Sequence, residues 1–365
     1  MPQRSHGARR ERELGVQIGA APLVGLDVGT SALRAARVSS SRGGSQLAAF
    51  AQIPLPVGAV VDGQIQDHEV VSDAISRLWK RSKLGSDKVV VGLANHRVVV
   101  RQVELPYLEE KELRDSIRFQ AADHVPMPAD EAEFDFDILG EFTNDDGDRM
   151  MNVLLVAAAT EMVEGFVDTV QSAGLDVAGV DLSPFAVARA ISPEARGEVG
   201  GAGAQAIVDV GAGVTDILIH VGGEPRFVRI LLIGGDGITS ALARELDLSL
   251  EQAEALKFDL SKGVSDADAY DIVAREVDVL VEEIRGSIDY YTTREKGEEV
   301  SSVLLTGGGS LSQGLLQKLE LGLQTKVELA APLAGVRTKL TSEIQKQVEP
   351  VVGTAMGLSM WEARR

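Results

Sequence analysis

Two short segments of the chain combine an aspartate with glycines in a pattern that suits phosphate binding. The first is LDVGTSALR, which contains Asp27, and the second is VDVGAGVTD, which contains Asp209. In both, an apolar run ends at the aspartate, and glycine then allows the backbone to turn tightly and approach a ligand. Backbone N–H groups and hydroxyls in such turns donate to phosphate oxygens. The residues expected to contact phosphate are Gly29, Thr30, Ser31, Arg34, Gly211, Gly213 and Thr215.

The two aspartates are expected to act through a cation. A carboxylate cannot approach phosphate favourably unless positive charge lies between them. Mg²⁺ keeps several of its waters when it binds to proteins. Asp27 and Asp209, one from each segment, can hold those waters. The pair therefore predicts a Mg²⁺-phosphate site between two parts of the molecule.

Two further signals lie later in the chain. Glu254 and Lys257 in AEALK occupy one face of a predicted helix, where they can bind ribose hydroxyls. The glycines of LLTGGGSLSQGL, Gly307, Gly308 and Gly309, allow the backbone to approach a flat base at a strand-to-helix turn. Each signal alone has an ordinary explanation, such as a hairpin turn, a solvated ion pair or a helix cap. Together, and in this order, they predict a cleft for Mg-nucleotide.

The elements that must position these residues occur twice. Residues 23–56 show the pattern of three short strands joined by turns, and residues 205–235 repeat it. Amphipathic spacing predicts one long helix over 268–296, beyond the second strand set. The stretch 192–204 is rich in glycine, proline and charge, which favours a linker. We interpret the pattern as an internal duplication of an α/β unit.

The composition limits the functional classes. The 365 residues carry 36 basic and 55 acidic side chains, a formal net charge of −19, which argues against a general nucleic-acid binder and against adhesion to anionic lipid. The sequence contains no cysteine, which excludes disulfides and thiolate metal sites within it. Its most apolar run, 150–159, is about half the ~20 residues that a membrane-spanning helix needs. Residues 1–21 are polar and arginine-rich, lack the apolar segment of a signal peptide, and are predicted to form a mobile tail.

Taken in order, the motifs resemble those of the actin/Hsp70/sugar-kinase superfamily. LDVGTS is similar to its first phosphate loop, VDVGAGVTD to its second, and TGGGS to its adenosine loop. The segment IGGDGITSALARELDLSLEQAEALK, which contains Gly234 and Gly235, resembles the FtsA and PilM branch of bacterial actin-like proteins. The segment LPYLEEKELRDSIRFQAADHVPMPADE resembles the PilM family of type IV pilus assembly proteins.

This resemblance implies a fold, ligands and a partner. The implied fold class is α/β, with two actin-like (ribonuclease H-like) domains around a nucleotide cleft and an FtsA-type subdomain inserted in the first. The implied cofactors are ATP and Mg²⁺, with Gly234 and Gly235 joining the cofactor-binding residues. The implied partner is the N-terminal cytoplasmic peptide of a PilN-like inner-membrane protein, and self-association is left open. The protein is expected in the cytoplasm, recruited to the cytoplasmic face of the cell membrane.

The resemblance also implies domain boundaries. The first actin-like domain is expected to comprise residues 22–86 and 175–191, with a C-terminal helix over 350–362 packed back on it. The expected inserted subdomain is 87–174, the linker 192–204 and the second actin-like domain 205–349.

Two other functions are kept as alternatives. A phosphotransferase of the sugar-kinase or Hsp70 fold needs a carboxylate beside its acceptor, and Asp181 and Asp216 are candidates by position. An FtsA-like division filament should end in a basic amphipathic helix, whereas residues 352–360 predict a packed helix followed by only two basic residues, Arg364 and Arg365. No residue is assigned as catalytic, and ATP turnover is expected to be slow or absent.

Overall fold

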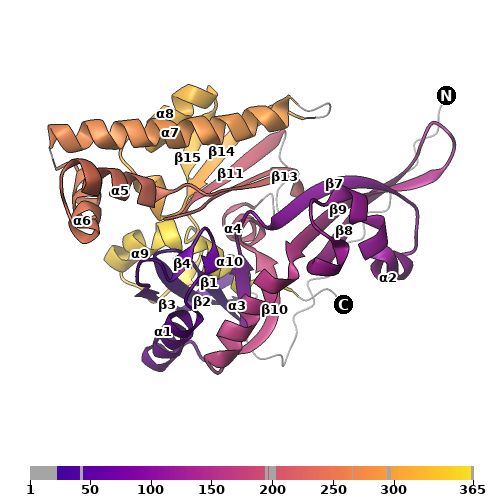
Figure 1. Cartoon of the computed structure of the whole chain (residues 1–365), viewed down its shortest axis with the longest axis horizontal. Helices are drawn as coiled ribbons and strands as arrows, with labels where there is room; N and C mark the ends of the chain where they lie inside the picture. The colour runs from indigo at the N-terminus through magenta and orange to yellow at the C-terminus, as the bar shows by residue number, and fades with distance from the viewer. Residues whose placement is uncertain are drawn as a thin grey trace.

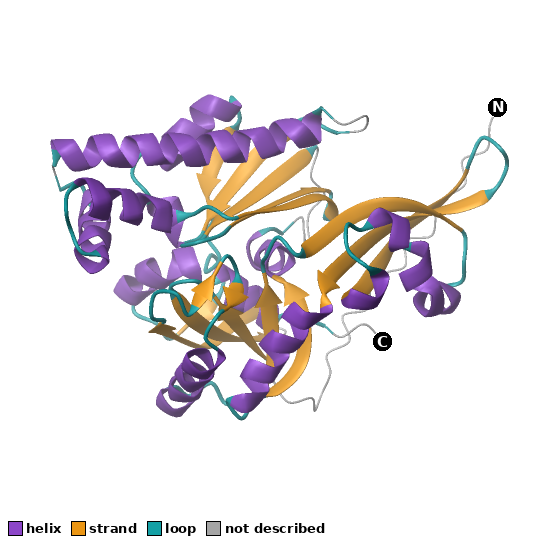
Figure 2. Ribbon diagram, viewed as in Figure 1, coloured by secondary structure: helices purple, strands orange, loops and turns teal. Residues whose placement is uncertain are grey.

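The computed structural model describes residues 23–362 apart from 42–43, 194–195, 197–202, 265 and 294–296. The predicted tail 1–21 and most of the predicted linker 192–204 lie outside these described residues. Figure 1 shows two sheet-based lobes, one above the other, with a smaller sheet projecting to the right from their junction. Figure 2 shows that helices flank both large sheets.

The lower lobe contains, within the described residues, a six-stranded sheet with the order β10-β6-β1-β2-β3-β16. β1 pairs antiparallel with β2 and parallel with β6, and β10 extends the parallel side. Four of the five β1 residues are buried, as expected for a central strand covered on both faces. The strand bounds are β1 Val24–Val28, β2 Ala32–Ser41, β3 Gly44–Pro54, β6 Lys88–Leu93, β10 Asp176–Leu182 and β16 Arg337–Thr338.

The upper lobe repeats this plan. Its sheet has the order β13-β12-β11-β14-β15, with β11 antiparallel to β12 and parallel to β14. β11 therefore takes the place of β1, and each strand around it has a counterpart of the same direction in the lower lobe. The strand bounds are β11 Ala204–Val210, β12 Thr215–Val221, β13 Glu224–Leu231, β14 Val300–Thr306 and β15 Lys326–Leu329. The predicted duplication is confirmed.

Helices bury the faces of both sheets. The long helix α7 packs on the upper sheet through buried residues at helical spacing, among them Val273, Val277 and Ile284. Between the lobes, α4 places Val187 and Ala188 against Leu218 of β12. The lower-lobe helices are α1 His68–Arg81, α3 Thr160–Ser172, α4 Ser183–Ile191 and α10 Gly353–Ser359. The upper-lobe helices are α5 Gly235–Glu245, α6 Leu250–Ser261, α7 Ala267–Thr292 and α8 Leu315–Leu323, with the short 3-10 helix η3 Gly308–Leu311.

The projecting sheet has the order β7-β9-β8 and carries α2 on one face. Its own small core joins Leu113 and Ile117 of α2 to Met151 and Val153 of β9. The elements are β7 Val98–Pro106, α2 Glu110–Gln120, η1 Ala122–His124, η2 Ala129–Glu131, β8 Ala132–Thr143 and β9 Arg149–Ala159.

This sheet is narrower than the predicted inserted subdomain, 87–174. β6 belongs to the lower sheet, and α3 packs on the lower core through Phe166 and Val170. The backbone N–H of Ala159 donates to the carbonyl of Arg97 at 3.3 Å, so the projecting segment leaves and rejoins the lower lobe at one point. The sequence pattern missed this limit because β6 and α3 continue the alternation of strand and helix without a break.

The chain also returns to the lower lobe earlier than the predicted boundary of 349. β16 pairs with β3, and Leu333 and Val348 pack with Leu47 in the lower lobe. α10 is buried along its whole length. It packs closely on β1, since a Cβ on Gly25 would lie only 2.0 Å from the carbonyl oxygen of Ala355. The remaining elements are β4 Val60–Val61, β5 Gln64–Ile65, α9 Ser342–Val348 and η4 Glu349–Val351.

Candidate functional site

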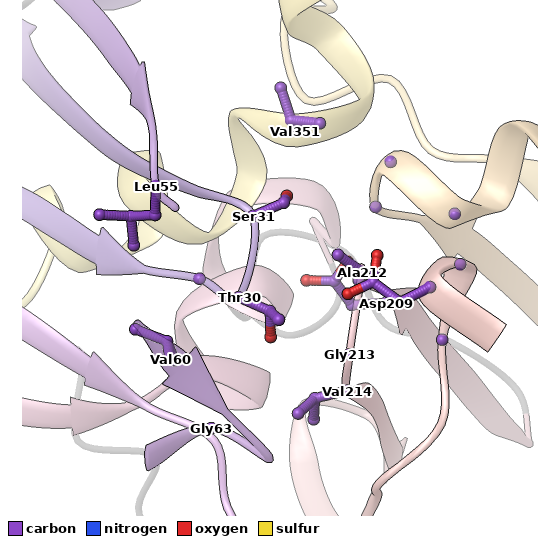
Figure 3. Close-up of a pocket in the computed structure, with 18 of the residues that line it drawn as sticks. Thr30, Ser31, Leu55, Val60, Gly63, Asp209, Ala212, Gly213, Val214 and Val351 are labelled. Carbon is purple, nitrogen blue, oxygen red and sulfur yellow. The ribbon is translucent and has the colours of Figure 1, made fainter. Parts of the chain in front are cut away.

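A cavity of about 1190 Å³ lies between the two lobes. Figure 3 shows Thr30 and Ser31 of the lower lobe facing Asp209, Ala212 and Gly213 of the upper lobe across it. All but one of the sequence-predicted site residues line this cavity. They are Asp27, Gly29, Thr30, Ser31, Arg34, Asp209, Gly211, Gly213, Gly234, Gly235, Glu254, Lys257, Gly307, Gly308 and Gly309.

The first turn follows β1. The N–H of Gly29 donates to the carbonyl of Ala32 at 3.1 Å, which closes the hairpin into β2. Arg34 on β2 lies opposite Asp27 in the strand register, and its guanidinium Nη1 lies 3.3 Å from Asp27 Oδ2. Burial raises the pKa of Asp27, and the charge and hydrogen bond of Arg34 act against this increase. The first aspartate is therefore held as half of an ion pair.

The second turn follows β11 and has the same backbone design. The N–H of Gly211 donates to the carbonyl of Val214 at 2.8 Å. Asp209 accepts a hydrogen bond at 3.2 Å from the hydroxyl of Thr354, at the start of α10. Burial raises the pKa of Asp209 to about 6, and the negative charge of Asp27 adds to this. The two turns are in contact, because a Cβ on Gly213 would lie 2.8 Å from Thr30 Oγ1.

Thr215 is the one predicted phosphate-contacting residue outside the cavity lining. Its side chain is fully buried, and its hydroxyl donates to the carbonyl of Ile233 at 2.7 Å. The residue begins β12, where the side chain of Thr215 points away from the turn and into the lobe. The hydroxyl of Thr215 thus contacts the connection between β13 and α5, outside the cavity lining.

The next residue, Asp216, does line the cavity. Its side chain is 6% exposed, and it lies directly opposite Asp209 in the pairing of β11 with β12. Burial raises the pKa of Asp216 well above the ordinary value, and the charges of Asp209 and Asp27 add to the effect. By contrast, Asp181 does not line the cavity, and it forms an ion pair with Arg189 at 2.7 Å. Of the two carboxylates considered for phosphotransfer, the structure brings only Asp216 to the site.

One wall of the cavity is formed by α5 and α6. Lys257 Nζ lies 2.6 Å from Glu254 Oε2 and donates to the carbonyl of Gly235 at 3.1 Å and to Thr239 Oγ1 at 2.8 Å. The capping box of Ser249 with Gln252 begins α6 and directs this face toward the cavity. Lys257 and Glu254 are therefore held against the start of α5. Hydroxyl groups of a ligand can replace some of the hydrogen bonds that these two side chains make there.

The opposite wall is the glycine turn after β14. Gly307 has φ of +89°, and a Cβ there would lie 2.2 Å from the carbonyl oxygen of Val210 and 2.3 Å from Asp209 Oδ1. Its N–H donates to the carbonyl of Pro350 at 2.9 Å, which ties the turn to the C-terminal segment. Only glycine fits here, because both the left-handed backbone and the contact exclude a side chain.

Three carboxylates, Asp27, Asp209 and Asp216, therefore line one cavity, and of these three only Asp27 forms an ion pair with another described residue. No three His, Cys, Asp or Glu side chains in the described part of the chain lie together closely enough to enclose a metal ion. A cation here would take its remaining ligands from water or phosphate, as Mg²⁺ usually does. The donor set and the uncompensated charge fit a hydrated divalent cation.

Sequence reasoning missed several lining residues. Thr354 comes from a helix 145 positions away from Asp209, and no local motif links the two. Asp236, in the first turn of α5, lines the cavity, and burial raises its pKa, against the effect of Lys257. The segment 54–63 also lines it, with exposed Val57 and Val61 at the rim. Their exposure is a property of the folded structure, so the sequence offered no signal for these residues.

The molecule consists of two α/β domains that share a strand order. They face each other across a cavity, and each contributes an aspartate turn to its lining. This arrangement defines an actin-like protein. The structure of MreB5 of Spiroplasma citri bound to ADP shares this fold, with a TM-score of 0.53 and 13% identity over 93% of this chain and 96% of that one. The chain belongs to the type IV pilus assembly protein PilM family, whose model matches residues 25–363.

Two other proteins show a higher sequence identity to this chain than MreB5 does. A chain of a PilM-PilN type IV pilus biogenesis complex is 27% identical, with a TM-score of 0.80 over 93% of this chain and 98% of that one. The cell division protein FtsA of Streptococcus pneumoniae serotype 2 is 26% identical over 364 residues, which cover 87% of this chain and 74% of FtsA. The resemblance to PilM is confirmed, and FtsA matches less well. In the described residues, no helix has the length and apolar content needed to span a membrane.

Proposed function

We propose that the cleft binds ATP together with Mg²⁺. The observation that carries this proposal is the convergence of two aspartate turns, one from each lobe, on a single cavity. Asp27 and Asp209 would hold waters of the cation, and the turns at 29–31 and 211–213 would offer backbone N–H groups and hydroxyls to phosphate oxygens. Mg²⁺, when bound, would neutralise charge on the phosphates.

The two walls of the cavity described above, α5 with α6 and the glycine turn after β14, would contact the ribose and the base of the nucleotide. Lys257 and Glu254 line the cavity, and Lys257 contacts the start of α5, which suits ribose hydroxyls. The turn at 307–309 presents backbone without side chains, which suits a flat base. The fold supports this arrangement, because an actin-like neighbour carries ADP in its solved structure.

Titration calorimetry tests this proposal. The wild type should bind ATP with Mg²⁺, and a chelator should weaken that affinity. The double variant Asp27→Asn with Asp209→Asn should bind at least about 100-fold more weakly, since each charged hydrogen-bonding group contributes roughly 1.5–3 kcal/mol. Asp247→Asn is the matched control, because Asp247 is an exposed carboxylate outside the cavity lining whose φ of +53° asparagine tolerates. Equal affinity in the wild type and the double variant would refute the site.

We further propose that the protein acts in pilus assembly by docking the N-terminal cytoplasmic peptide of a PilN-like membrane protein. Its support is family membership and a similar protein solved as a PilM-PilN complex. Docking would bring the protein to the cytoplasmic face of the membrane. The proposed position is the junction of the projecting sheet with the lower lobe. There β8 pairs only with β9 among the described strands, so its other edge can accept an extended peptide.

The junction defines a clean deletion for testing this partner. Removing 87–174 would take away β6 and α3, which belong to the lower lobe. Replacing residues 101–155 by a short glycine linker avoids this, because Val100 and Val156 are paired neighbours on β7 and β9 and still pack against the lower core. The shortened protein should lose peptide affinity in a fluorescence titration and should keep ATP affinity, which shows that the lobes still fold. Undiminished peptide affinity would place the partner elsewhere.

A further inference from the structure

The end of the lower lobe away from the cleft carries a cluster of basic side chains that the proposed functions do not use. Residues 77–88 contain five basic side chains and one acidic side chain, although the whole chain has a net charge of −19. They form the last turn of α1, the loop after it and the start of β6. Figure 1 shows α1 at the bottom of the lower lobe, on the side away from the upper lobe. Together with one residue of β2, the members of this basic end are Arg37, Arg77, Lys80, Arg81, Lys83 and Lys88.

Local structure brings these side chains to one surface. Arg77, Lys80 and Arg81 are spaced at i, i+3 and i+4 on α1, so they share a face of the helix, and all three are exposed. The guanidinium of Arg37 lies against the loop after α1, because a Cβ on Gly85 would be 3.2 Å from Arg37 Nη1. The helix, the loop and β2 therefore present their positive charges side by side.

Little of this positive charge is neutralised within the described part of the protein. Lys88 lies 3.9 Å from Asp176, and both side chains are more than half exposed. The other five basic side chains form no ion pair with a described residue, and the buried Nε of Arg37 has no hydrogen-bond partner there. The carbonyl end of α1 favours Lys80 and Arg81 in its last turn but does not account for the rest. The repulsion among these charges would be relieved by an external anion.

We propose that the basic end rests against anionic phospholipid headgroups at a membrane surface. The net charge of the chain opposes adhesion of the molecule as a whole. Charges farther away than about 8 Å are largely screened at physiological ionic strength, however, so the surface nearest the bilayer decides the outcome. Each lysine or arginine beside an anionic bilayer contributes about a fivefold factor in affinity. Separate, exposed side chains outside the cleft lining suit a fluid layer of headgroups.

A membrane fits this surface better than nucleic acid does. Nucleic-acid binders normally have a basic footprint and a basic domain, whereas here the positive charge is confined to one end of an acidic chain. The lipid contact would act beside the proposed docking of a membrane-protein peptide, because two weak contacts on one molecule hold it more tightly than either alone. It does not depend on that docking, since the basic end and the edge of β8 are formed by different residues.

Vesicle flotation with the full chain tests this proposal. At physiological ionic strength the wild type should float with vesicles of equimolar phosphatidylcholine and phosphatidylglycerol. It should not float with phosphatidylcholine alone, and high salt should release it from the anionic vesicles. A triple variant that removes the charged face of α1 should have an about 100-fold lower partition coefficient. This variant combines Arg77→Gln, Lys80→Gln and Arg81→Gln.

A second triple variant is the matched control. It removes three exposed positive charges that form no ion pair with a described residue and that lie on β7, α2 and β13. The control combines Arg101→Gln, Lys111→Gln and Arg229→Gln. Its net charge equals that of the α1 variant, and its partition coefficient should stay within about threefold of the wild type. Circular dichroism checks that both variants are folded.

Each result decides the proposal. Binding to anionic vesicles that the α1 variant loses and the control keeps supports it. A wild type that does not bind anionic vesicles overturns it, as do equal losses in both triple variants, which would reflect total charge. Displacement from the vesicles by inorganic phosphate or by a duplex oligonucleotide, at the same phosphate concentration, would assign the basic end to that ligand and overturn the lipid contact. The vesicles contain neither peptide nor nucleotide, so these results leave the proposed ATP and peptide sites untouched.

Discussion

The two aspartate turns share a backbone design but differ in their electrostatic surroundings. Asp27 has a cationic neighbour, Arg34, at 3.3 Å. Within the described residues, Asp209 accepts a side-chain hydrogen bond from the neutral hydroxyl of Thr354 and forms no ion pair, and it faces Asp216 across the strand pair. The lower turn is thus a compensated pair, whereas the upper turn brings together two carboxylates that have no ion-pair partner in the described part of the chain.

This difference indicates a division of roles between the duplicated halves. A compensated carboxylate can stay ionised and fixed whether or not a ligand is present, which suits a positioning role. Uncompensated buried carboxylates destabilise the unliganded fold and gain most when a cation arrives. We infer that cation affinity depends mainly on the upper half, and the following predictions are designed to test that asymmetry.

The largest effect is expected at Gly307, which lies against the upper aspartate. Ala at this position would strain a left-handed backbone and force the Cβ against Val210 and Asp209. We expect Gly307→Ala to lower the free energy of unfolding by about 4 kcal/mol, from backbone strain plus displacement of a packed turn. Gly314→Ala is the control, since Gly314 has φ of +80° with no atom within 4 Å of its Cβ position, and it should cost only about 1 kcal/mol. Equal losses in chemical denaturation would show that the close approach to Asp209 is unimportant.

The second prediction concerns pH. The folded protein holds the pKa of Asp209 at about 6, above the ordinary 3.8, so the folded state binds a proton more tightly than the unfolded chain. This group therefore favours folding below about pH 4 and loses that contribution as pH rises through 6. Asp209→Asn should become more stable than the wild type as pH rises from 4 to 7, by up to roughly 3 kcal/mol without metal.

The comparison with the lower turn sharpens this test. Asp27→Asn also removes a buried charge, but it leaves Arg34 without its partner, so we expect a much smaller gain. Urea denaturation of the two variants at several pH values, in chelator, measures the difference. A pH-dependent gain of equal size in both would contradict the division of roles.

The third prediction compares the same two positions in ligand binding. Asp209→Ala should weaken Mg-ATP about 100-fold, because it removes from the upper turn the carboxylate that is expected to hold waters of the cation. Asp27→Ala should weaken it only about 10-fold, because the released Arg34 can then pair with phosphate directly. Calorimetry with and without Mg²⁺ distinguishes the cases, and the Asp27 variant should depend less on Mg²⁺ than the wild type. Identical losses would remove the basis for treating the turns as unlike.

Much of this arrangement could be predicted from the sequence. The repeated aspartate segments, the long helix now defined as α7 and the glycine turn after β14 follow from local pattern, because turn geometry and helical spacing are short-range properties. The same reasoning placed all but one of the site residues on the cavity. Thr215 lies outside the cavity lining because a residue at the first position of a strand points to one face or the other by register, which a motif does not record.

The remaining features depend on contacts between distant parts of the chain. Thr354 reaches Asp209 only because α10 packs back on the lower sheet through Gly25. The environment of Asp216 follows from strand pairing and burial, which the sequence does not record. From sequence position alone, Asp216 and Asp181 were therefore equal candidates for the carboxylate of a phosphotransferase. The limits of the projecting segment likewise required knowing that β6 pairs with β1. Local sequence pattern thus predicted the turns and helices of the site. The charges and hydrogen bonds around each aspartate depend on tertiary contacts.

The smallest predicted effect concerns a link that only the lower half possesses. The projecting sheet grows from the lower lobe, and Gln102 on β7 donates from Nε2 to the carbonyl of Pro225 on β13 at 2.8 Å. Movement of the lobes on ATP binding would therefore reach the proposed peptide site through this contact. We expect Gln102→Ala to reduce the effect of ATP on peptide affinity by about two- to threefold, the worth of one exposed hydrogen bond, with ATP affinity unchanged. Arg101→Ala is the control, because the neighbouring β7 residue points to the opposite face of the strand. Peptide titrations with and without ATP measure the coupling, and a full ATP effect in Gln102→Ala would mean that the lobes communicate with the projecting sheet by another route.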